Sequence, residues 1–223
     1  QAAPVTTFRA TGRSGMSLCF DVGANIGAYS VQLSKRCSPG GTVHSFEPVY
    51  HIRQKLHLNL AVNGARNVTV NDFALGDQDA LLEMHQVKEG VFRAGTSSFV
   101  KNATIQAMGN DKFVVDVAKT RTLDGYVAEM GFQRIDFIKI DVEGFEFNVL
   151  RGGIKSIRQF RPAIILEFEF DRHGDLSNKF VEFFAGLNYG VFHCWSIGRN
   201  LVVEPFDFSF QPKERNVLCL PAG

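Results

Sequence analysis

The stretch Phe20-Asp21-Val22-Gly23-Ala24-Asn25-Ile26-Gly27 decides the fold of this 223-residue chain. It starts inside a short apolar run, Ser17–Val22, that is typical of a buried strand. It leads into Ile26–Arg36, where apolar residues recur at helical spacing. The two glycines permit a sharp turn and the close approach of a ligand. A strand, a glycine turn and a helix in this order predict the first unit of an α/β sheet that binds a nucleoside-type ligand.

The rest of the chain repeats this alternation of strands and helices. Further strands are predicted at Thr42–Phe46, Asn67–Phe73, Leu81–Val87, Lys112–Val117, Ile135–Ile140, Pro162–Phe168, Gly190–Ile197 and Asn216–Leu220, and further helices at Tyr50–Val62, Thr122–Met130, Phe145–Leu150 and Ser177–Leu187. Such a pattern predicts an α/β fold of the Rossmann-like, doubly wound kind, with a mostly parallel sheet covered on both faces. We expect a single domain over residues 1–223, with an irregular insert at about 78–118.

Composition excludes several classes of partner. The formal net charge of +1 gives no basic patch for nucleic acid or an anionic membrane surface. No apolar run reaches the roughly 18 residues of a membrane span. The four cysteines (Cys19, Cys37, Cys194 and Cys219) match no zinc or C-x-x-C spacing, so we interpret them as small buried hydrophobes in a reducing compartment. We therefore expect a cytoplasmic protein, with a homo-oligomer left open, and read the start at Gln1 as a fragment or a processed chain.

Acidic residues gather where the predicted strands end, which is where ligands bind in such sheets. The strand ends are Asp21, Glu47, Phe73, Asp141 and Glu167, with Asp72 beside Phe73. Glu47 can accept both ribose hydroxyls of a nucleoside, while Asp72 and Phe73 suit the amino group and the ring of adenine. The glycine turn lacks the third glycine of G-x-G-x-x-G, which weakens a dinucleotide interpretation. S-adenosylmethionine has no phosphate and carries a sulfonium cation, so a carboxylate such as Asp21 suits it.

A second dense site is Lys139-Ile140-Asp141-Val142-Glu143-Gly144, at the end of a core strand. Charge at a buried strand end is costly unless it is paired or used. Either Lys139 neutralises these acids, or Asp141 and Glu143 lie beside the methionine end of the cofactor or the methyl acceptor. Glu167 is in phase with its apolar strand, and His173 follows it as a candidate general base. The histidines show no metal-ligand spacing, although Asp141, Glu143 and Glu167 are ligands that a magnesium-like cation accepts.

The motifs in this order resemble the FkbM family of class I methyltransferases over about residues 17–170. They are Phe20–Gly27, Ser45-Phe46-Glu47-Pro48, Ala74-Leu75-Gly76-Asp77, Thr122-Leu123-Asp124, Ile138–Glu146 and Val149-Leu150-Arg151-Gly152. The resemblance implies a seven-stranded sheet with the last strand antiparallel, S-adenosylmethionine as methyl donor, and a hydroxyl acceptor on a sugar, a polyketide or a related small molecule.

The resemblance also assigns roles by position. Asp21, Gly23, Asn25 and Gly27 are expected around the methionine part, Glu47 at the ribose, Asp72, Phe73 and Ala74 at the adenine, and Ser97 and Ser98, within a G-x-S-S stretch, at the substrate. Ala24 and Asp141 are also expected to bind the cofactor. A hydroxyl acceptor must lose its proton, so we expect Asp141, Glu143 or Glu167 to be the base, with His173 as an alternative.

Two other functions share part of this pattern. A nicotinamide-dependent oxidoreductase has a similar strand–turn–helix and an acid at the Glu47 position, but this sequence lacks the third glycine and a Tyr-x-x-x-Lys pair. A non-catalytic domain could retain the fold, although the complete set of acids and glycines argues against that.

Overall fold

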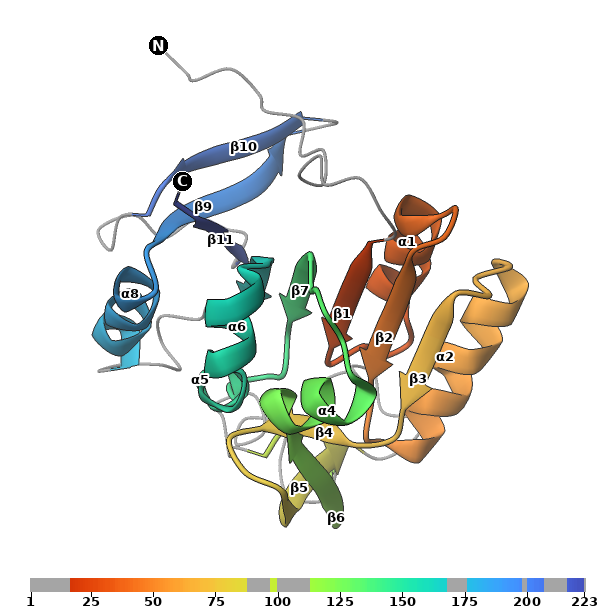
Figure 1. Ribbon diagram of the computed structural model, residues 1–223. Coiled ribbons are helices and arrows are strands. Elements are labelled where there is room, and N and C mark those ends of the chain that lie inside the picture. Colours follow the sequence, from red (N-terminus) through yellow and green to blue (C-terminus); the bar gives the residue numbers. More distant parts are fainter. Residues whose placement is uncertain are drawn as a thin grey trace.

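The computed structural model describes residues 17–87, 97–99, 113–167, 176–197, 200–206 and 216–222. Its large sheet contains β1 (Leu18–Val22), β2 (Thr42–Phe46), β3 (Val68–Asn71), β7 (Phe137–Ile140), β8 (Ala163–Glu167), β9 (Tyr189–Ile197), β10 (Asn200–Pro205) and β11 (Asn216–Pro221). The helices are α1 (Ala28–Cys37), α2 (Tyr50–Val62), α4 (Leu123–Met130), α5 (Glu146–Gly152), α6 (Ile154–Phe160) and α8 (Leu176–Gly186). Helices lie on both faces of the sheet, so the doubly wound α/β prediction is confirmed (Figure 1).

The strand order is β10-β9-β11-β8-β7-β1-β2-β3. The neighbouring strands β8, β7, β1, β2 and β3 run parallel, whereas β11 is antiparallel to both β8 and β9. The last strand is therefore antiparallel, as expected, but the described sheet has eight strands rather than seven, because β10 pairs with β9 at the edge. The order reverses between β1 and β7, and in open α/β sheets such a switch point is where ligands bind.

A small second sheet lies beyond the carboxyl ends of β1, β2 and β7 (Figure 1). It consists of β4 (Ala74–Gly76), β5 (Ala80–Val87) and β6 (Phe113–Thr122) in the order β4-β6-β5. Strand β5 pairs antiparallel with β6. The strands β5 and β6 were predicted, with ends that differ by up to five residues, whereas β4 was not, since three residues are too short for a periodic pattern.

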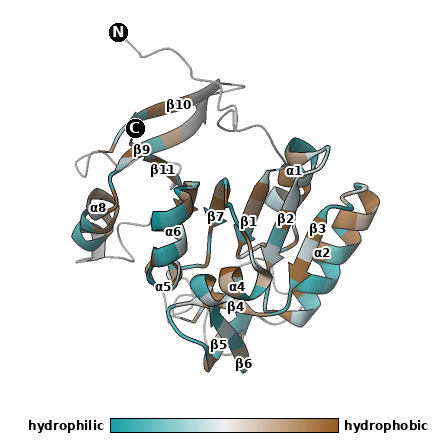
Figure 2. Ribbon diagram, viewed as in Figure 1, coloured by the Kyte–Doolittle hydropathy of each residue, from teal (hydrophilic) through white to brown (hydrophobic). Residues whose placement is uncertain are grey.

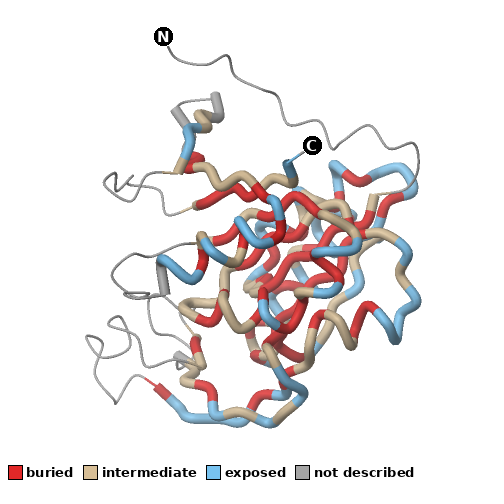
Figure 3. Tube along the Cα trace, turned by 60° about the vertical axis from the view of Figure 1, so that its left-hand side comes forward, coloured by how far each residue is buried: buried red, intermediate tan, exposed pale blue. Residues whose placement is uncertain are grey.

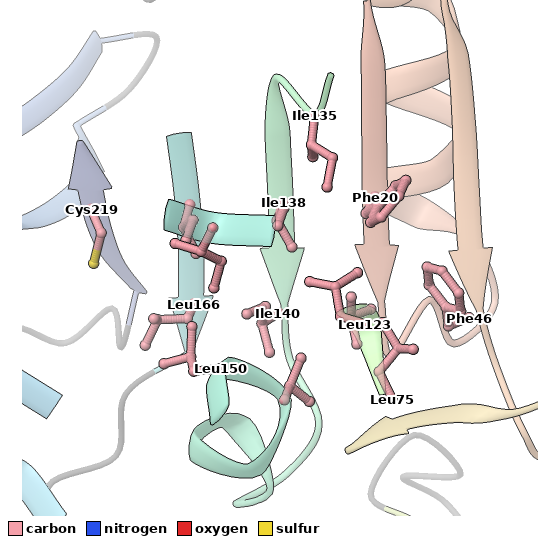
Figure 4. Packing of buried hydrophobic residues seen from close by; sticks show 14 of the residues in the cluster. Phe20, Phe46, Leu75, Leu123, Ile135, Ile138, Ile140, Leu150, Leu166 and Cys219 are labelled. Atoms are coloured by element: carbon pink, nitrogen blue, oxygen red, sulfur yellow. The ribbon is translucent and has the colours of Figure 1, made fainter. Parts of the chain in front are cut away.

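Strand β1 shows how one short run serves two layers, because successive side chains point to opposite faces. Leu18, Phe20 and Val22 belong to the main core, which also holds residues of α4, α5, α6 and α8. Cys19 packs with Cys37 and Val43 on the other face, below α1. The apolar side chains of the core converge between the sheet and the helices (Figure 4), and the apolar residues cluster along the central strands (Figure 2).

Burial follows the same layers. The buried trace runs mainly through the strands, while the helices carry exposed positions on their outer sides (Figure 3). All four cysteines are buried and are free thiols, in agreement with their interpretation as small hydrophobes. Helix α4 begins one residue later than predicted, because the Thr122 hydroxyl caps it by accepting from Gly125 N.

Candidate active site

A cavity opens at the carboxyl edge of the central strands, between the large and the small sheet. Its lining comes from the ends of β1, β2 and β7, from β4 and β5, and from the segment 97–99: Val22, Gly23, Asn25, Phe46, Glu47, Pro48, Ile52, Ala74, Leu75, Met84, Ser97, Phe99, Asp141, Val142, Glu143 and Phe145. Five of the predicted cofactor residues (Gly23, Asn25, Glu47, Ala74 and Asp141) are therefore brought together with Glu143.

The glycine turn is pressed against the end of the neighbouring strand β7. Gly23 N and Ala24 N both donate to Phe46 O, at 3.2 and 3.0 Å, which ties the turn to β2. Gly23 has a φ of +74°, and a Cβ added there would lie 1.9 Å from Asp141 O. Only glycine fits this backbone conformation and this contact. The glycine thus allows the turn to pack closely against the end of β7 beside the cavity.

Asp21 and Lys139 form a buried ion pair below the turn. Asp21 is 0% exposed, and its Oδ2 accepts from Ser30 Oγ at 2.6 Å. The Nζ of Lys139 lies 3.7 Å from Asp21 Oδ1 and 3.1 Å from Asp141 Oδ2. It also donates to Gly23 O at 3.2 Å. Burial raises the pKa of Asp21, and the ammonium of Lys139 opposes that rise. Lys139 therefore joins Asp21, which is buried and does not line the cavity, to Asp141 at the end of β7.

Glu47 is held rigidly by the backbone around it. Its Oε2 accepts from Asn25 N at 2.9 Å, and its Oε1 accepts from Val49 N at 2.9 Å. Burial raises the pKa of Glu47 to about 7, against the lowering effect of these two bonds and of the nearby Arg53 and Lys139. An ionised carboxylate has about four acceptor positions. Two of them thus remain for hydroxyl donors in the cavity.

The carboxyl ends of β7 and β8 bring three acids together. One carboxylate oxygen from each of Asp141, Glu143 and Glu167 lies within 4.8 Å of the other two. Burial, followed by the negative charge of Asp141 and a hydrogen bond with it, raises the pKa of Glu167 to about 8. Among the described residues this is the one group with the charge and spacing to hold a divalent cation. Without a cation, the same spacing favours a proton retained by Glu167 near neutral pH.

The remaining cofactor predictions occupy other places. Gly27 caps the N-terminus of α1, and Ala24 packs against Leu56 and Leu60. Strand β3 ends at Asn71, so Asp72 is exposed. The ring of Phe73 points into the core, 5.7 Å from Phe46 between ring centroids, which corrects the expectation that it faces the adenine. Phe73 was misplaced because an apolar residue at a strand end suits a ligand and a core equally well.

The two predicted substrate serines differ. Ser97 lines the cavity, whereas Ser98 is 1% exposed and donates from Oγ to Glu143 O at 2.7 Å. The hydroxyl of Ser98 is therefore engaged by the protein, not directed at the cavity. His173, the alternative base, lies outside the described residues.

Sequence reasoning missed Glu146 and an apolar wall. Glu146 is 1% exposed and its Oε1 accepts from Val142 N and Gly144 N. An acid set between Phe145 and Phe147 was a readable signal, because charge in apolar surroundings usually has a purpose.

The apolar wall of the cavity consists of Ile52, Met84, Phe99 and Phe145. These apolar residues are scattered over the chain, so no local pattern connects them.

Comparison with known proteins decides the family of this fold and site. The family model of the methyltransferase FkbM domain matches residues 21–194, which is most of the chain. The chain belongs to the FkbM methyltransferase family. A methyl-donor cofactor is implied by this family and by the fold.

Individual proteins are also similar to the chain. The chain is 28% identical over 195 residues to the AMB antimetabolite synthetase AmbE of Pseudomonas aeruginosa, covering 73% of this chain and 9% of that protein. It is 26% identical over 149 residues to Methyltransferase 1 of Beauveria bassiana, covering 61% and 58%. The crystal structure of methyltransferase FkbM from Methylobacillus flagellatus superposes with a TM-score of 0.59 at 18% identity, over 94% of this chain and 45% of the other. The chain thus spans less than two thirds of each relative.

No helix in the described parts of the chain has the length and apolar character to cross a membrane.

Proposed function

We propose that this FkbM-family domain transfers a methyl group from S-adenosylmethionine to a hydroxyl of a sugar, a polyketide or a related small molecule. The observation that carries the proposal is the convergence of the glycine turn, Glu47, Asp141 and Glu143 on one cavity at the switch point of the sheet, with Glu167 beside the latter two acids. We further propose that residues 1–223 act as one domain, and that the protein is cytoplasmic with a small-molecule rather than a nucleic-acid partner, in keeping with its net charge of +1.

The residues present fit this cofactor. The remaining acceptor positions of Glu47 suit the two ribose hydroxyls, and the close turn at Gly23 and Asn25 suits the methionine part. Ala74 and the apolar wall of Ile52 and Met84 offer a flat, apolar contact for adenine. The carboxylates of Asp141 and Glu143 lie where a positive charge would be stabilised. When bound, S-adenosylmethionine supplies a methyl group on a sulfonium, which is already an excellent leaving group.

The protein then has to position the acceptor, exclude water and accept one proton. We assign proton removal from the hydroxyl to the ionised form of Glu167, whose carboxylate lies within 4.8 Å of Asp141 and Glu143; its pKa of about 8 means that this form is the minor one at pH 7 and grows as the pH rises. Asp141 supports it in two ways: its negative charge raises the proton affinity of Glu167, and its own contact with Lys139 keeps it in place. Glu143 contributes further negative charge.

Alanine variants of Asp141, Glu143, Glu167 and His173 test the base. With an identified acceptor and saturating cofactor, we expect Glu167→Ala to lower turnover by about 10²–10⁴-fold. Exposed Glu83 on β5 provides the control, and Glu83→Ala should keep full turnover. If Glu167→Ala keeps full activity, Glu167 is not the base, and if all four site variants keep it, the base lies outside this set.

Titration separates the proposal from its rivals. The purified protein should bind S-adenosylhomocysteine and should bind NAD at least about 100-fold more weakly, because no third glycine opens the turn for a pyrophosphate. Tight NAD binding without S-adenosylhomocysteine binding would establish the oxidoreductase alternative. Binding of neither would favour a non-catalytic domain.

A further inference from the structure

The loop between β7 and α5 carries two of the cavity acids in an unusual backbone conformation. It runs from Asp141 to Phe145. Glu143 has a φ of 55° and Gly144 a φ of 102°, so two consecutive residues lie in the left-handed region. This conformation is uncommon for a residue with a side chain. Backbone of this kind persists where the surroundings hold it in place.

One restraint on the loop is Glu146, the first residue of α5. Its Oε1 accepts from Val142 N and from Gly144 N, both at 3.1 Å, so one oxygen bridges the two sides of Glu143. Burial raises the pKa of Glu146 to about 7, and these backbone bonds oppose the rise. Burying a carboxyl group is unfavourable unless its bonds compensate. Glu146 is not among the residues that line the cavity, so its effect on a ligand is exerted through the loop.

The second restraint comes from a distant part of the chain. Ser98 Oγ donates to Glu143 O at 2.7 Å. The segment that carries Ser98 is itself fixed to β5, because His85 N donates to Ser98 O at 2.9 Å and Ser98 N donates to His85 O at 3.0 Å. The amides on both sides of Glu143 and its carbonyl are thus held by two different elements.

We propose that Glu146 and Ser98 are positioning residues that set the loop conformation directing Asp141 and Glu143 into the cavity. The inference rests on the proposed function, in which that cavity holds the cofactor. The two side chains bind the backbone of Val142, Glu143 and Gly144, while Asp141 and Glu143 line the cavity. The alternative is that Glu146 and Ser98 stabilise the fold only in general.

Asp124 offers a matched control for Glu146. It is also a carboxylate that accepts backbone N–H groups, from Lys155 N at 3.1 Å and from Ser156 N at 2.8 Å, but at the start of α6. Asp124→Ala therefore removes a comparable set of bonds without touching the loop. Glu146→Gln is the conservative variant, because an amide oxygen can still accept from both N–H groups.

The test is amide hydrogen exchange of the whole chain by NMR, joined to calorimetric titration with S-adenosylhomocysteine. In Glu146→Ala the amides of Val142 and Gly144 should exchange about tenfold faster, and affinity should fall about fivefold or more. Glu146→Gln should restore both to within about threefold of wild type. Asp124→Ala should speed up hydrogen exchange only at the amides of Lys155 and Ser156, and it should leave the affinity for S-adenosylhomocysteine unchanged. Ser98→Ala should speed up hydrogen exchange at the Val142 and Gly144 amides, and this variant replaces Glu146→Ala in the test if Glu146→Ala does not fold.

The inference is overturned if the loop amides are unchanged in Glu146→Ala and Ser98→Ala, if Glu146→Gln behaves like the alanine variant, or if Asp124→Ala weakens binding as much. Failure of the proposed function would look different. Wild-type protein would then not bind S-adenosylhomocysteine, while the exchange of Val142 and Gly144, which needs no cofactor, would still depend on Glu146.

Discussion

Glu47 should make cofactor binding depend on pH in the neutral range. The residue is 6% exposed, and burial raises the pKa of its carboxyl group to about 7. The ionised form offers acceptors for both ribose hydroxyls, because only two of its positions are used by Asn25 N and Val49 N. The protonated form replaces one acceptor with a donor. Affinity should therefore be highest when Glu47 is ionised and should fall as the pH drops through 7.

The size of the effect follows from that pKa. A group with a pKa of about 7 is roughly nine-tenths ionised at pH 8 and one-tenth ionised at pH 6. If only the ionised form binds ribose fully, the dissociation constant of S-adenosylhomocysteine should rise about tenfold from pH 8 to pH 6, or about 1.4 kcal/mol.

Calorimetric titration at pH 6, 7 and 8 measures this directly. Glu47→Gln should bind more weakly at pH 8 and should lose the pH dependence, since an amide does not titrate in this range. Glu167 has a pKa of about 8 and titrates nearby, so Glu167→Gln serves as the control, and in that variant the tenfold change should remain. Equal affinity of the wild-type protein at pH 6 and pH 8, or an unaltered pH dependence in Glu47→Gln, would refute the reasoning.

Three further predictions concern stability. Gly64→Ala should lower the free energy of unfolding by about 1–2 kcal/mol for its φ of +65° alone, because nothing lies within 4 Å of the new Cβ. Gly23→Ala should lower it by at least about 4 kcal/mol, because its Cβ meets Asp141 O at 1.9 Å. Melting temperatures that agree within about 2 °C would contradict this difference. Lys139→Met leaves buried Asp21 without its cation. We therefore expect the free energy of unfolding in urea to fall by about 3–5 kcal/mol at pH 8 and by less at pH 5. Equal losses at the two pH values would argue against the ion pair. Burial lowers the pKa of His44 from 6.5 to about 4, so its stabilising effect is present above pH 6.5 and is lost as the pH falls toward 4. Over that interval the free energy of unfolding should drop by up to about 3 kcal/mol more than it does in His44→Gln. If the free energy of unfolding changes with pH equally in the two proteins, His44 is not the cause of the drop.

The sheet could be predicted because its strands and helices have strong periodic patterns. Strand β2 and helix α2 have the bounds expected from sequence, and the acids at the ends of β1, β2, β7 and β8 follow from strand geometry. The additional strand β10 was missed, because an edge strand has weaker apolar patterning than a central one. Helix α6 was not predicted, because only Gly153 separates it from α5 and the sequence pattern indicated a single helix, Phe145–Leu150, in this region.

The site was harder to predict because contacts, not residue types, define it. That Glu47 binds Asn25 N and Val49 N depends on how the turn and β2 meet in space. The contacts of Lys139 with Asp21 and Gly23 O, and those of Glu146 with Val142 N and Gly144 N, likewise depend on the three-dimensional arrangement. Phe73 was predicted to contact the ligand but lies in the core, because β3 ends two residues earlier than predicted.

The most direct measurement is a crystal structure of the protein with S-adenosylhomocysteine bound. The nucleoside should lie in the cavity between the large and small sheets, with both ribose hydroxyls within about 3 Å of the Glu47 carboxylate. The sulfur should face the side of Asp141 and Glu143. A nucleoside bound elsewhere, or a ribose that makes no contact with Glu47, would contradict the proposal that this cavity is the cofactor site.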